Sequence, residues 1–339
     1  MHFSLLVPPI LALIDDEGPV YKALGCQLLS RLLIPVRQSG SDILQRTNLS
    51  SVFEEAVAPC LLSLPTITSE EESLELLRVA YPALLSLLKT SHLKPPPGAT
   101  NHELRRPFSS RQQRKQADAH LYTGKVTKIL RTELIPSFHH ISSGTPAAVS
   151  SFASFPYPEL SSFMLSQVTI MVHEIGINSA KYLQELIPLT YSVLVNPFGT
   201  SYIPLLLSAI TATTTVILNS HPRIWRWRGE VLGSVCSCWI HALEEEKRVA
   251  ESEPTVQERN GYGRASRELK KLKKHLKGVL YLLKFALLNP IAVEDRLDAG
   301  QLDAMENIDR ELHELVNADD ALEDLLLSDI DPADAHEFF

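Results

Sequence analysis

The stretch "VPPILALIDDEGPVYKALGCQLLSRLL", residues 7–33, decides the fold because it places an acidic turn between two apolar runs. In both runs the apolar residues recur at helical spacing, and the prolines that open the first run are tolerated in a first helical turn. Pro19 suits the first position of the second helix, and the acids before it can accept hydrogen bonds from that helix's free N–H groups. Two helices joined by so short a turn lie antiparallel, and neither can bury its apolar face alone. The stretch resembles one unit of a HEAT repeat, although an ordinary helical hairpin carries the same pattern.

Helical segments follow along the rest of the chain, and strand-like alternation is scarce. The apolar spacing predicts helices over residues 51–64, 70–89, 118–139, 158–178, 180–195, 202–219, 222–247 and 266–288. The distance from one pair to the next is compatible with the ~40–47 residues of HEAT or armadillo units. Such arrays bury a continuous core between stacked pairs. The predicted fold is therefore all-α, an α-solenoid of HEAT/armadillo-like helical repeats.

Charge divides the chain into two predicted regions. Residues 1–293 hold the solenoid pattern, with exposed loops near 94–116, 139–160 and 251–266. Residues 294–339 form an acidic C-terminal segment with a net charge of −14, against +6 for the rest, and together these give the chain's −8. We expect short amphipathic helices or partial disorder there. The segment is either a solvated tail or docks on a basic surface, of a partner or of the chain's own "RELKKLKKHLK" helix.

The composition indicates a soluble helical protein with reduced cysteines. Its 339 residues exceed the usual size of one compact core, 45% are hydrophobic and 21% are charged. The four cysteines, Cys26, Cys60, Cys236 and Cys238, are scattered, as in cytosolic or nuclear proteins. Cys236 and Cys238 lack a second ligand pair at zinc spacing, so we expect small buried side chains and no metal or cofactor.

One apolar segment raises the question of a membrane span. Between Glu185 and Arg223 the sequence contains no Asp, Glu, Lys or Arg, and "YIPLLLSAITATTTVIL" within it approaches the ~20 residues that cross a bilayer. Its threonines dilute the apolar character, and no basic flank marks a cytoplasmic side. A helix buried by its neighbours fits better, and no signal peptide is evident at the N-terminus. We therefore expect no membrane partner.

The most unusual stretch is "HPRIWRWRGEVLGSVCSCW", residues 221–239. Treated as a helix from residue 222, it has an apolar face and a second stripe of smaller residues. Gly229 and Gly233 belong to that stripe, and glycines four residues apart allow a neighbouring helix to approach closely.

The candidate partner-binding residues of this stretch are Arg223, Trp225, Arg226, Trp227 and Arg228. Arginines at the N-terminal end of a helix oppose its macrodipole, so something else must favour them. The candidates are carboxylates of a partner, the acidic turns of an adjacent repeat, or stacking on the two tryptophans. Arginine interleaved with tryptophan also occurs in nucleic-acid sites, but the chain is acidic overall and has no recognised nucleic-acid module, so we expect no nucleic acid.

No pattern in the sequence predicts catalysis. His-Glu dipeptides hold di-iron centres in helical-repeat hydroxylases, and this chain has them at His102-Glu103, His173-Glu174, His313-Glu314 and His336-Glu337. Their irregular spacing makes convergence on one face unexpected. The chain also has no Gly-rich phosphate loop after a strand, no G-x-S-x-G and no H-E-x-x-H. We predict no catalytic residues and no enzyme activity, with a di-iron hydroxylase as the least favoured alternative.

Three stretches in this order, "PPILALIDDEGPVYKALGCQLL", "NSHPRIWRWRGEVLGSVCSCW" and "LKKHLKGVLYLLK", resemble the Tel-two-interacting protein two family. The resemblance covers most of residues 7–290 and implies a non-enzymatic scaffold subunit of the Triple-T co-chaperone complex. It implies homologues of Tel-two-interacting protein one and of the Tel-two protein as partners. It further implies maturation of phosphatidylinositol-3-kinase-related kinases with the ninety-kilodalton heat-shock chaperone, and hence telomere maintenance and the DNA damage response.

For such a subunit we expect localisation to the cytoplasm and the nucleus. The alternative function is that of another helical-repeat adaptor or of a transport receptor. Two features depart from the family pattern. The chain starts almost directly inside a helix pair, where further N-terminal repeats are expected, and the resemblance does not settle the role of the acidic segment.

Overall fold

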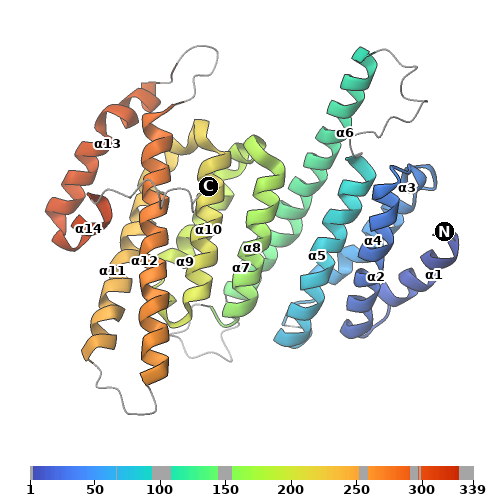
Figure 1. Cartoon of the computed structure of the whole chain (residues 1–339), viewed down its shortest axis with the longest axis horizontal. Helices are drawn as coiled ribbons and strands as arrows, with labels where there is room; N and C mark the ends of the chain where they lie inside the picture. The colour runs from blue at the N-terminus through green and yellow to red at the C-terminus, as the bar shows by residue number, and fades with distance from the viewer. Residues whose placement is uncertain are drawn as a thin grey trace. The chain divides into compact units, whose positions relative to one another are not determined.

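A computed structural model describes residues 3–65, 67–93, 108–143, 155–251, 259–290, 297 and 299–327, and every secondary-structure element in these ranges is helical (Figure 1). The chain divides into two compact units, Met1–Ser143 and Gly144–Phe339. The boundary falls inside the loop predicted near 139–160. The division at residue 293 stays a prediction.

Unit 1 contains nine helical segments in its described residues. They are α1 (Phe3–Ile14), α2 (Pro19–Gln38), α3 (Ile43–Arg46), α4 (Leu49–Val57), the 3₁₀ segment η1 (Ala58–Leu62), α5 (Glu70–His92), α6 (Phe108–Ile129), the π-helical turn η3 (Leu130–Leu134) and α7 (Ile135–Ser142).

The opening hairpin predicted from residues 7–33 is confirmed. The turn is held by Asp16, whose Oδ1 accepts a hydrogen bond of 2.8 Å from Gly18 N–H, and α2 then begins at Pro19. The two helices approach closely at Gly25, where a Cβ would lie 2.7 Å from both Cγ1 and the backbone N of Ile14. Only glycine fits at this point, because any side chain would push α1 away from α2.

The next hairpin of unit 1 stacks on the first. Its second helix, α5, begins with a capping box in which Ser69 and Glu72 satisfy each other's backbone N–H groups. α5 packs mainly on α2, α4 contacts α1, and the side-chain amide of Gln45 donates to Ser91 O, 46 residues along the chain. Equivalent helices thus lie side by side, as stacking of hairpins requires.

Unit 2 continues with elements of the same kind. They are α8 (Pro158–Ile175), η4 (Gly176–Tyr182), α9 (Leu183–Leu194), η5 (Gly199–Tyr202), α10 (Ile203–Asn219), η6 (His221–Trp227), α11 (Arg228–Glu251), α12 (Arg259–Leu288), α13 (Ala299–Ala318), η7 (Asp320–Leu322) and α14 (Glu323–Leu326).

Contacts in unit 2 repeat at the spacing expected of a helical-repeat array. α10 packs mainly on α8, and α11 packs on α9. The hydroxyl of Ser162 lies 2.8 Å from that of Ser208, 46 residues on, and the buried hydroxyls of Ser179 and Ser220 lie 3.1 Å apart across 41 residues. These separations match the predicted ~40–47 residues per repeat. The all-α solenoid of helical repeats is confirmed.

Several predicted boundaries differ from the structure. The helix predicted over 158–178 ends at Ile175, because Gly176 adopts a positive φ of 61° and breaks the regular hydrogen bonding. α6 begins at Phe108 and α12 at Arg259, earlier than predicted. The helix over 118–139 is continuous but contains the turn η3. Pro136 has no backbone N–H to donate to the carbonyl oxygen of residue 132. The loss of this α-helical hydrogen bond accounts for the wider, π-helical turn at η3.

The apolar part of the charge-free stretch forms α10, which packs on α8 in unit 2. α10 also contacts α9 and α12, so neighbours cover it on several sides. Two helical stretches, 158–194 and 199–219, are long and apolar enough to cross a bilayer by length and composition, with half of each tested window buried. The first is interrupted at Gly176. Core helices of soluble proteins pass the same test, so the two stretches are weak support for a membrane span.

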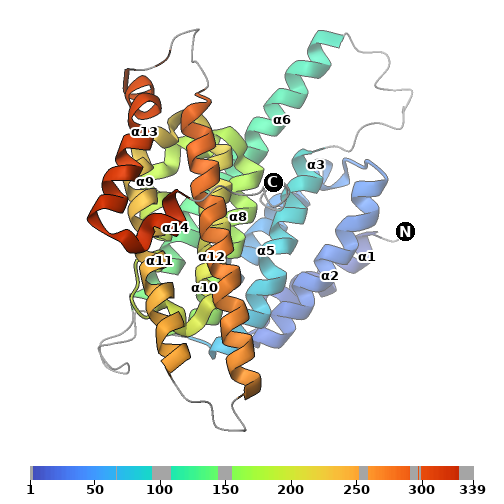
Figure 2. The same ribbon diagram turned by 60° about the vertical axis from the view of Figure 1, so that its left-hand side comes forward.

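The acidic C-terminal segment contributes α13, η7 and α14. These helices lie beside α11 and α12 in unit 2 (Figure 2). Ile308, Leu312, Leu325 and Leu326 are at most 2% exposed, so the segment has an apolar side that is fully buried. Residues 328–339 lie outside the described residues.

Candidate partner-binding site

The five candidate residues lie where η6 passes into α11. The helix predicted from residue 222 is wrong in type for its first two turns, which are 3₁₀, and the α-helix begins only at Arg228. The 3₁₀ turn starts with Arg223 N–H donating to Ser220 O at 2.9 Å. Ile224 is fully buried and anchors the turn, while Arg223 and Arg226 are exposed. Trp225, Trp227 and Arg228 are partly buried.

A second expectation for this stretch is also wrong. A Cβ at Gly229 or Gly233 would meet nothing within 4 Å among the described residues, so no helix approaches closely there. The glycine that does receive a close neighbour from this stretch is Gly300, at the start of α13. A Cβ there would collide with the indole ring of Trp225.

Arg228 is paired with carboxylates of the acidic segment. Its Nη2 lies 2.8 Å from Glu311 Oε1, and its Nε donates to Glu311 Oε2 at 3.1 Å. Asp303 Oδ2 accepts a third, longer bond of 3.4 Å from Nη2. The hydrogen bond with Glu311 raises the pKa of Arg228. Forked pairs of this kind fix geometry as well as charge.

Trp225 lies in the same contact. α13 covers its ring at Gly300, and Gln301 Nε2 donates to Pro222 O at 3.2 Å. The guanidinium carbon of Arg226 lies 5.0 Å from the centroid of the Trp225 ring, within cation–π range. One of the expected explanations for the arginines, stacking on a tryptophan, is therefore seen, whereas the carboxylates that bind Arg228 come from helix α13 and not from a partner or from the acidic turn of an adjacent repeat. Trp225 stacks with Arg226, and acidic side chains of this same chain bind Arg228.

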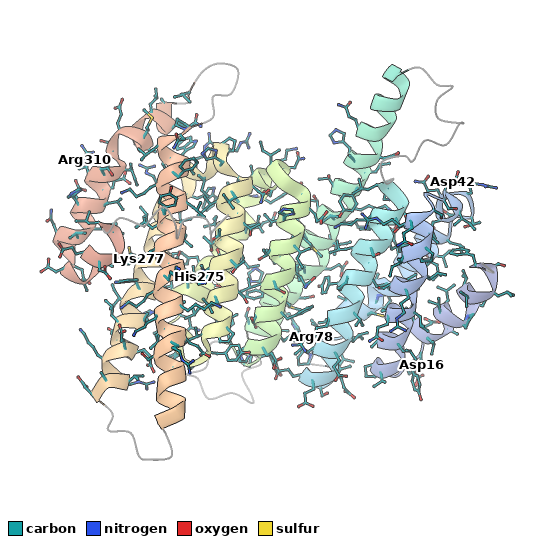
Figure 3. The ribbon with its side chains drawn as sticks, viewed as in Figure 1. Asp16, Asp42, Arg78, His275, Lys277 and Arg310 are labelled. Atoms are coloured by element: carbon teal, nitrogen blue, oxygen red, sulfur yellow. The ribbon has the colours of Figure 1, made fainter. Side chains whose placement is uncertain are left out.

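The basic helix α12 receives the other part of the acidic segment. Lys277 Nζ pairs with Asp324 Oδ1 at 2.7 Å, and Lys284 lies 3.6 Å from Asp309. Figure 3 shows Lys277 on α12 and Arg310 on the outer side of α13, away from α12. Between the two alternatives for residues 299–327, the structure favours docking on the chain's own basic helix over a solvated tail.

Trp239 lies at the centre of this second contact. Its Nε1–H donates to Ala321 O at 3.0 Å, and the Nζ atoms of Lys273 and Lys277 lie 5.2 and 5.6 Å from its ring centroid. Trp239 is only 1% exposed. It therefore acts as part of the core and offers no surface to a partner.

The other side of η6 is open. A pocket of about 290 Å³ is lined by Ala180, Lys181, Leu183, Gln184, Arg223, Arg226, Trp227 and Glu230. It thus gathers three of the predicted residues, Arg223, Arg226 and Trp227, whereas Trp225 and Arg228 contact α13. Its walls carry three cations against one anion.

Sequence reasoning missed the pocket residues from η4 and from the start of α9, namely Lys181 and Gln184. Nothing local marks them, because the contact between η4 and η6 forms only when one hairpin stacks on the next. The missed ion-pair partners of Arg228, Glu311 and Asp303, did leave a signal. They belong to the acidic segment, whose charge is opposite to that of residues 221–239, called the Arg/Trp stretch.

The four cysteines are buried and unpaired. Burial raises the pKa of Cys236 to about 11 and that of Cys238 to about 12. The hydrogen bond between the two thiols raises the pKa of Cys26, which donates, and lowers that of Cys60, which accepts. The thiols of Cys236 and Cys238 are therefore neutral near pH 7, which agrees with a packing role for this pair.

The His-Glu dipeptides in the described part of the chain do not converge. His173 is exposed on α8, and His313 Nδ1 lies 2.6 Å from the backbone O of Asp309 on α13. Within the described ranges, no group of three or more His, Cys, Asp or Glu side chains is placed to hold a metal ion. The dipeptides at residues 102–103 and 336–337 lie outside those ranges.

Comparison with known proteins relates the chain to a protein family. A family model described as the Tti2 family, which corresponds to Tel-two-interacting protein two, matches residues 1–201. No curated protein and no solved structure matches the chain. The matched residues comprise all of unit 1 and the part of unit 2 that ends in η5, just before α10 and the Arg/Trp stretch. Because the match spans more than half of the sequence, the chain belongs to the Tti2 family.

Proposed function

We propose that this protein is a non-enzymatic scaffold subunit of the Triple-T co-chaperone complex. The observation that carries the proposal is the Tti2 family match over residues 1–201. It supports association with homologues of Tel-two-interacting protein one and of the Tel-two protein. The stacked hairpins agree with this role, because each repeat contributes surface to an extended array on which other proteins can bind.

The finer proposal concerns what the complex does. Through it, the protein supports the maturation and stability of phosphatidylinositol-3-kinase-related kinases together with the ninety-kilodalton heat-shock chaperone. Telomere maintenance and the DNA damage response would then depend on it indirectly. We also propose cytoplasmic and nuclear localisation, which the unpaired state of all four cysteines supports.

Acute depletion of the protein tests the finer proposal. The half-lives of several phosphatidylinositol-3-kinase-related kinases are measured by pulse-chase labelling, with kinases of unrelated families as controls. We expect the new synthesis of these kinases to continue while their half-lives shorten and the controls stay unchanged. Unchanged half-lives would contradict a role in their maturation. A pull-down dominated by nuclear-pore and cargo proteins would indicate a transport receptor instead.

A further inference from the structure

One side of η6 is covered by α13, and the other side is open and lines a pocket. The contacts on the covered side indicate what kind of ligand the open side can bind. On one side, α13, an acidic amphipathic helix, already covers Trp225 and binds Arg228 through Glu311 and Asp303. On the other side, Arg223, Arg226 and Trp227 line the pocket of about 290 Å³. Trp225 and Arg228 are therefore bound to an acidic helix, whereas Arg223, Arg226 and Trp227 line an open pocket.

The charges of the pocket favour a negatively charged ligand. Lys181, Arg223 and Arg226 line it with Glu230 as the only acidic residue among its described walls. Within the described part of the chain, neither Lys181 nor Arg223 forms an ion pair, and both side chains are exposed. Two exposed cations thus line the same pocket, and an anion bound between them would relieve their mutual repulsion.

Apolar surface accompanies the cations. Trp227 and Ala180, both partly buried, line the pocket. Ile177, in the same short helix as Lys181, is 64% exposed. A free inorganic anion would leave this apolar surface uncovered, whereas an amphipathic acidic helix offers both carboxylates and apolar side chains, as α13 does.

We propose that the pocket binds an acidic helical segment of another subunit, with partner carboxylates on Lys181 and Arg223 and an apolar partner side chain against Trp227. This inference rests on the proposed function, since it requires a stable complex with a protein partner. The partner helix would bind the open side of η6 as α13 binds the other side, with carboxylates on cations and a packing contact on a tryptophan. A polypeptide is favoured over nucleic acid because the chain as a whole carries −8.

Zero-length cross-linking tests the contact in the intact complex. The full chain is co-expressed with its Tel-two-interacting protein one homologue and with the Tel-two homologue, and the purified complex is treated with a water-soluble carbodiimide. This reagent joins a lysine amine to a carboxylate in direct contact with it. Peptide mass spectrometry is expected to show Lys181 joined to an Asp or Glu of a partner subunit. Lys181 joined only to residues 328–339 of its own chain, or not joined at all in an intact complex, would overturn the inference.

Charge reversal provides a second readout with a matched control. In Lys181→Glu/Arg223→Glu, two exposed cations of the pocket become anions, and in the control Lys270→Glu/Lys271→Glu two exposed cations of α12 do. Both variants change the net charge equally, and thermal melts confirm that each is folded. We expect the pocket variant to weaken partner binding at least tenfold and the control to change it less than twofold. Equal effects, or none, would overturn the inference.

A charge swap decides whether the loss is direct. The partner carboxylate identified by cross-linking is changed to lysine and combined with the pocket variant, and partial recovery of binding is expected. Failure of the wild-type chain to form any complex would instead contradict the proposed function. If the wild-type chain shifts a single-stranded oligonucleotide and the pocket variant does not, the pocket binds nucleic acid and the inference is wrong.

Discussion

Arg228 and Glu311 are 83 residues apart in the chain and form a forked ion pair, with Nη2–Oε1 at 2.8 Å and Nε–Oε2 at 3.1 Å. The pair joins the first residue of α11 to the middle of α13. It explains why an arginine is tolerated at the positive end of a helix, since a carboxylate from elsewhere in the chain offsets the unfavourable dipole.

Breaking this pair is expected to destabilise unit 2 modestly. The side chains of Arg228 and Glu311 are 23% and 30% exposed, so solvent screens the attraction in part. A double-mutant cycle with Arg228→Met and Glu311→Gln, followed by urea unfolding, should give a coupling free energy of about 1 kcal/mol. The control cycle at Arg310 and Glu314, both 69% exposed, should give less than about 0.5 kcal/mol. Equal coupling free energies in the two cycles would show that the forked pair stabilises unit 2 no more than an exposed ion pair does.

The packing of α13 against the ring of Trp225 can be tested at Gly300. A Cβ at this position would overlap the indole ring, so Gly300→Ala should lower the free energy of unfolding by about 1–3 kcal/mol despite alanine's better helix propensity. Gly233→Ala is the control, because a Cβ there meets nothing within 4 Å of the described structure. It should raise stability by up to about 1 kcal/mol. Opposite signs in the two variants are the expected result, and the same sign in both would contradict the contact.

The opening hairpin has a corresponding test in unit 1. Gly25→Ala places a Cβ 2.7 Å from the backbone N of Ile14, which cannot move without shifting α1. We expect a loss of about 1–3 kcal/mol in the free energy of unfolding. Gly124→Ala in α6, where nothing lies within 4 Å, should be neutral or slightly stabilising. Thermal melts of the two variants measure the difference, and a stable Gly25→Ala protein would mean that the helices lie farther apart.

The cysteines of α11 predict a loss of stability at alkaline pH. Burial raises the pKa of Cys236 to about 11 and of Cys238 to about 12 from an ordinary value of 9.0, so the unfolded state loses these protons first. Stability should therefore fall as pH rises above 9, by at most about 1.4 kcal/mol per pH unit for each thiol. The fall should stop once pH passes the folded pKa values. Cys236→Ala/Cys238→Ala should show a shallower slope between pH 9 and 11, and an unchanged slope would contradict this assignment.

The sequence alone predicts most of the fold for identifiable physical reasons. The hairpin at residues 7–33 is marked by local chemistry, namely an acidic turn, Pro19 at a first helical position and regularly spaced apolar residues. α5 and α10 likewise follow from long runs of apolar residues at helical spacing. Boundaries were less predictable where backbone conformation decides them, as at Gly176, whose positive φ leaves no unambiguous trace in the sequence.

The candidate site was predictable only in part. Arg/Trp composition drew attention to residues 223–228, but treating them as one α-helix gave the wrong geometry, because the first two turns are 3₁₀. One side of this stretch faces α13 through a contact between residues 83 positions apart in the chain. The other side lines the pocket through the contact between η4 and η6. Such long-range contacts come from the stacking of hairpins. Apolar periodicity predicts that the hairpins stack, but it does not predict which residues of neighbouring hairpins meet.

Light scattering on the purified protein tests the central claim, that these stacked hairpins serve to hold other proteins. The full chain is expressed alone and together with its Tel-two-interacting protein one homologue, and each preparation passes through size-exclusion chromatography coupled to multi-angle scattering. We expect a poorly behaved chain alone and, on co-expression, one stable species whose mass exceeds 37.8 kDa by that of the partner. A monodisperse 37.8 kDa species that repeatedly elutes apart from the co-expressed partner would contradict it.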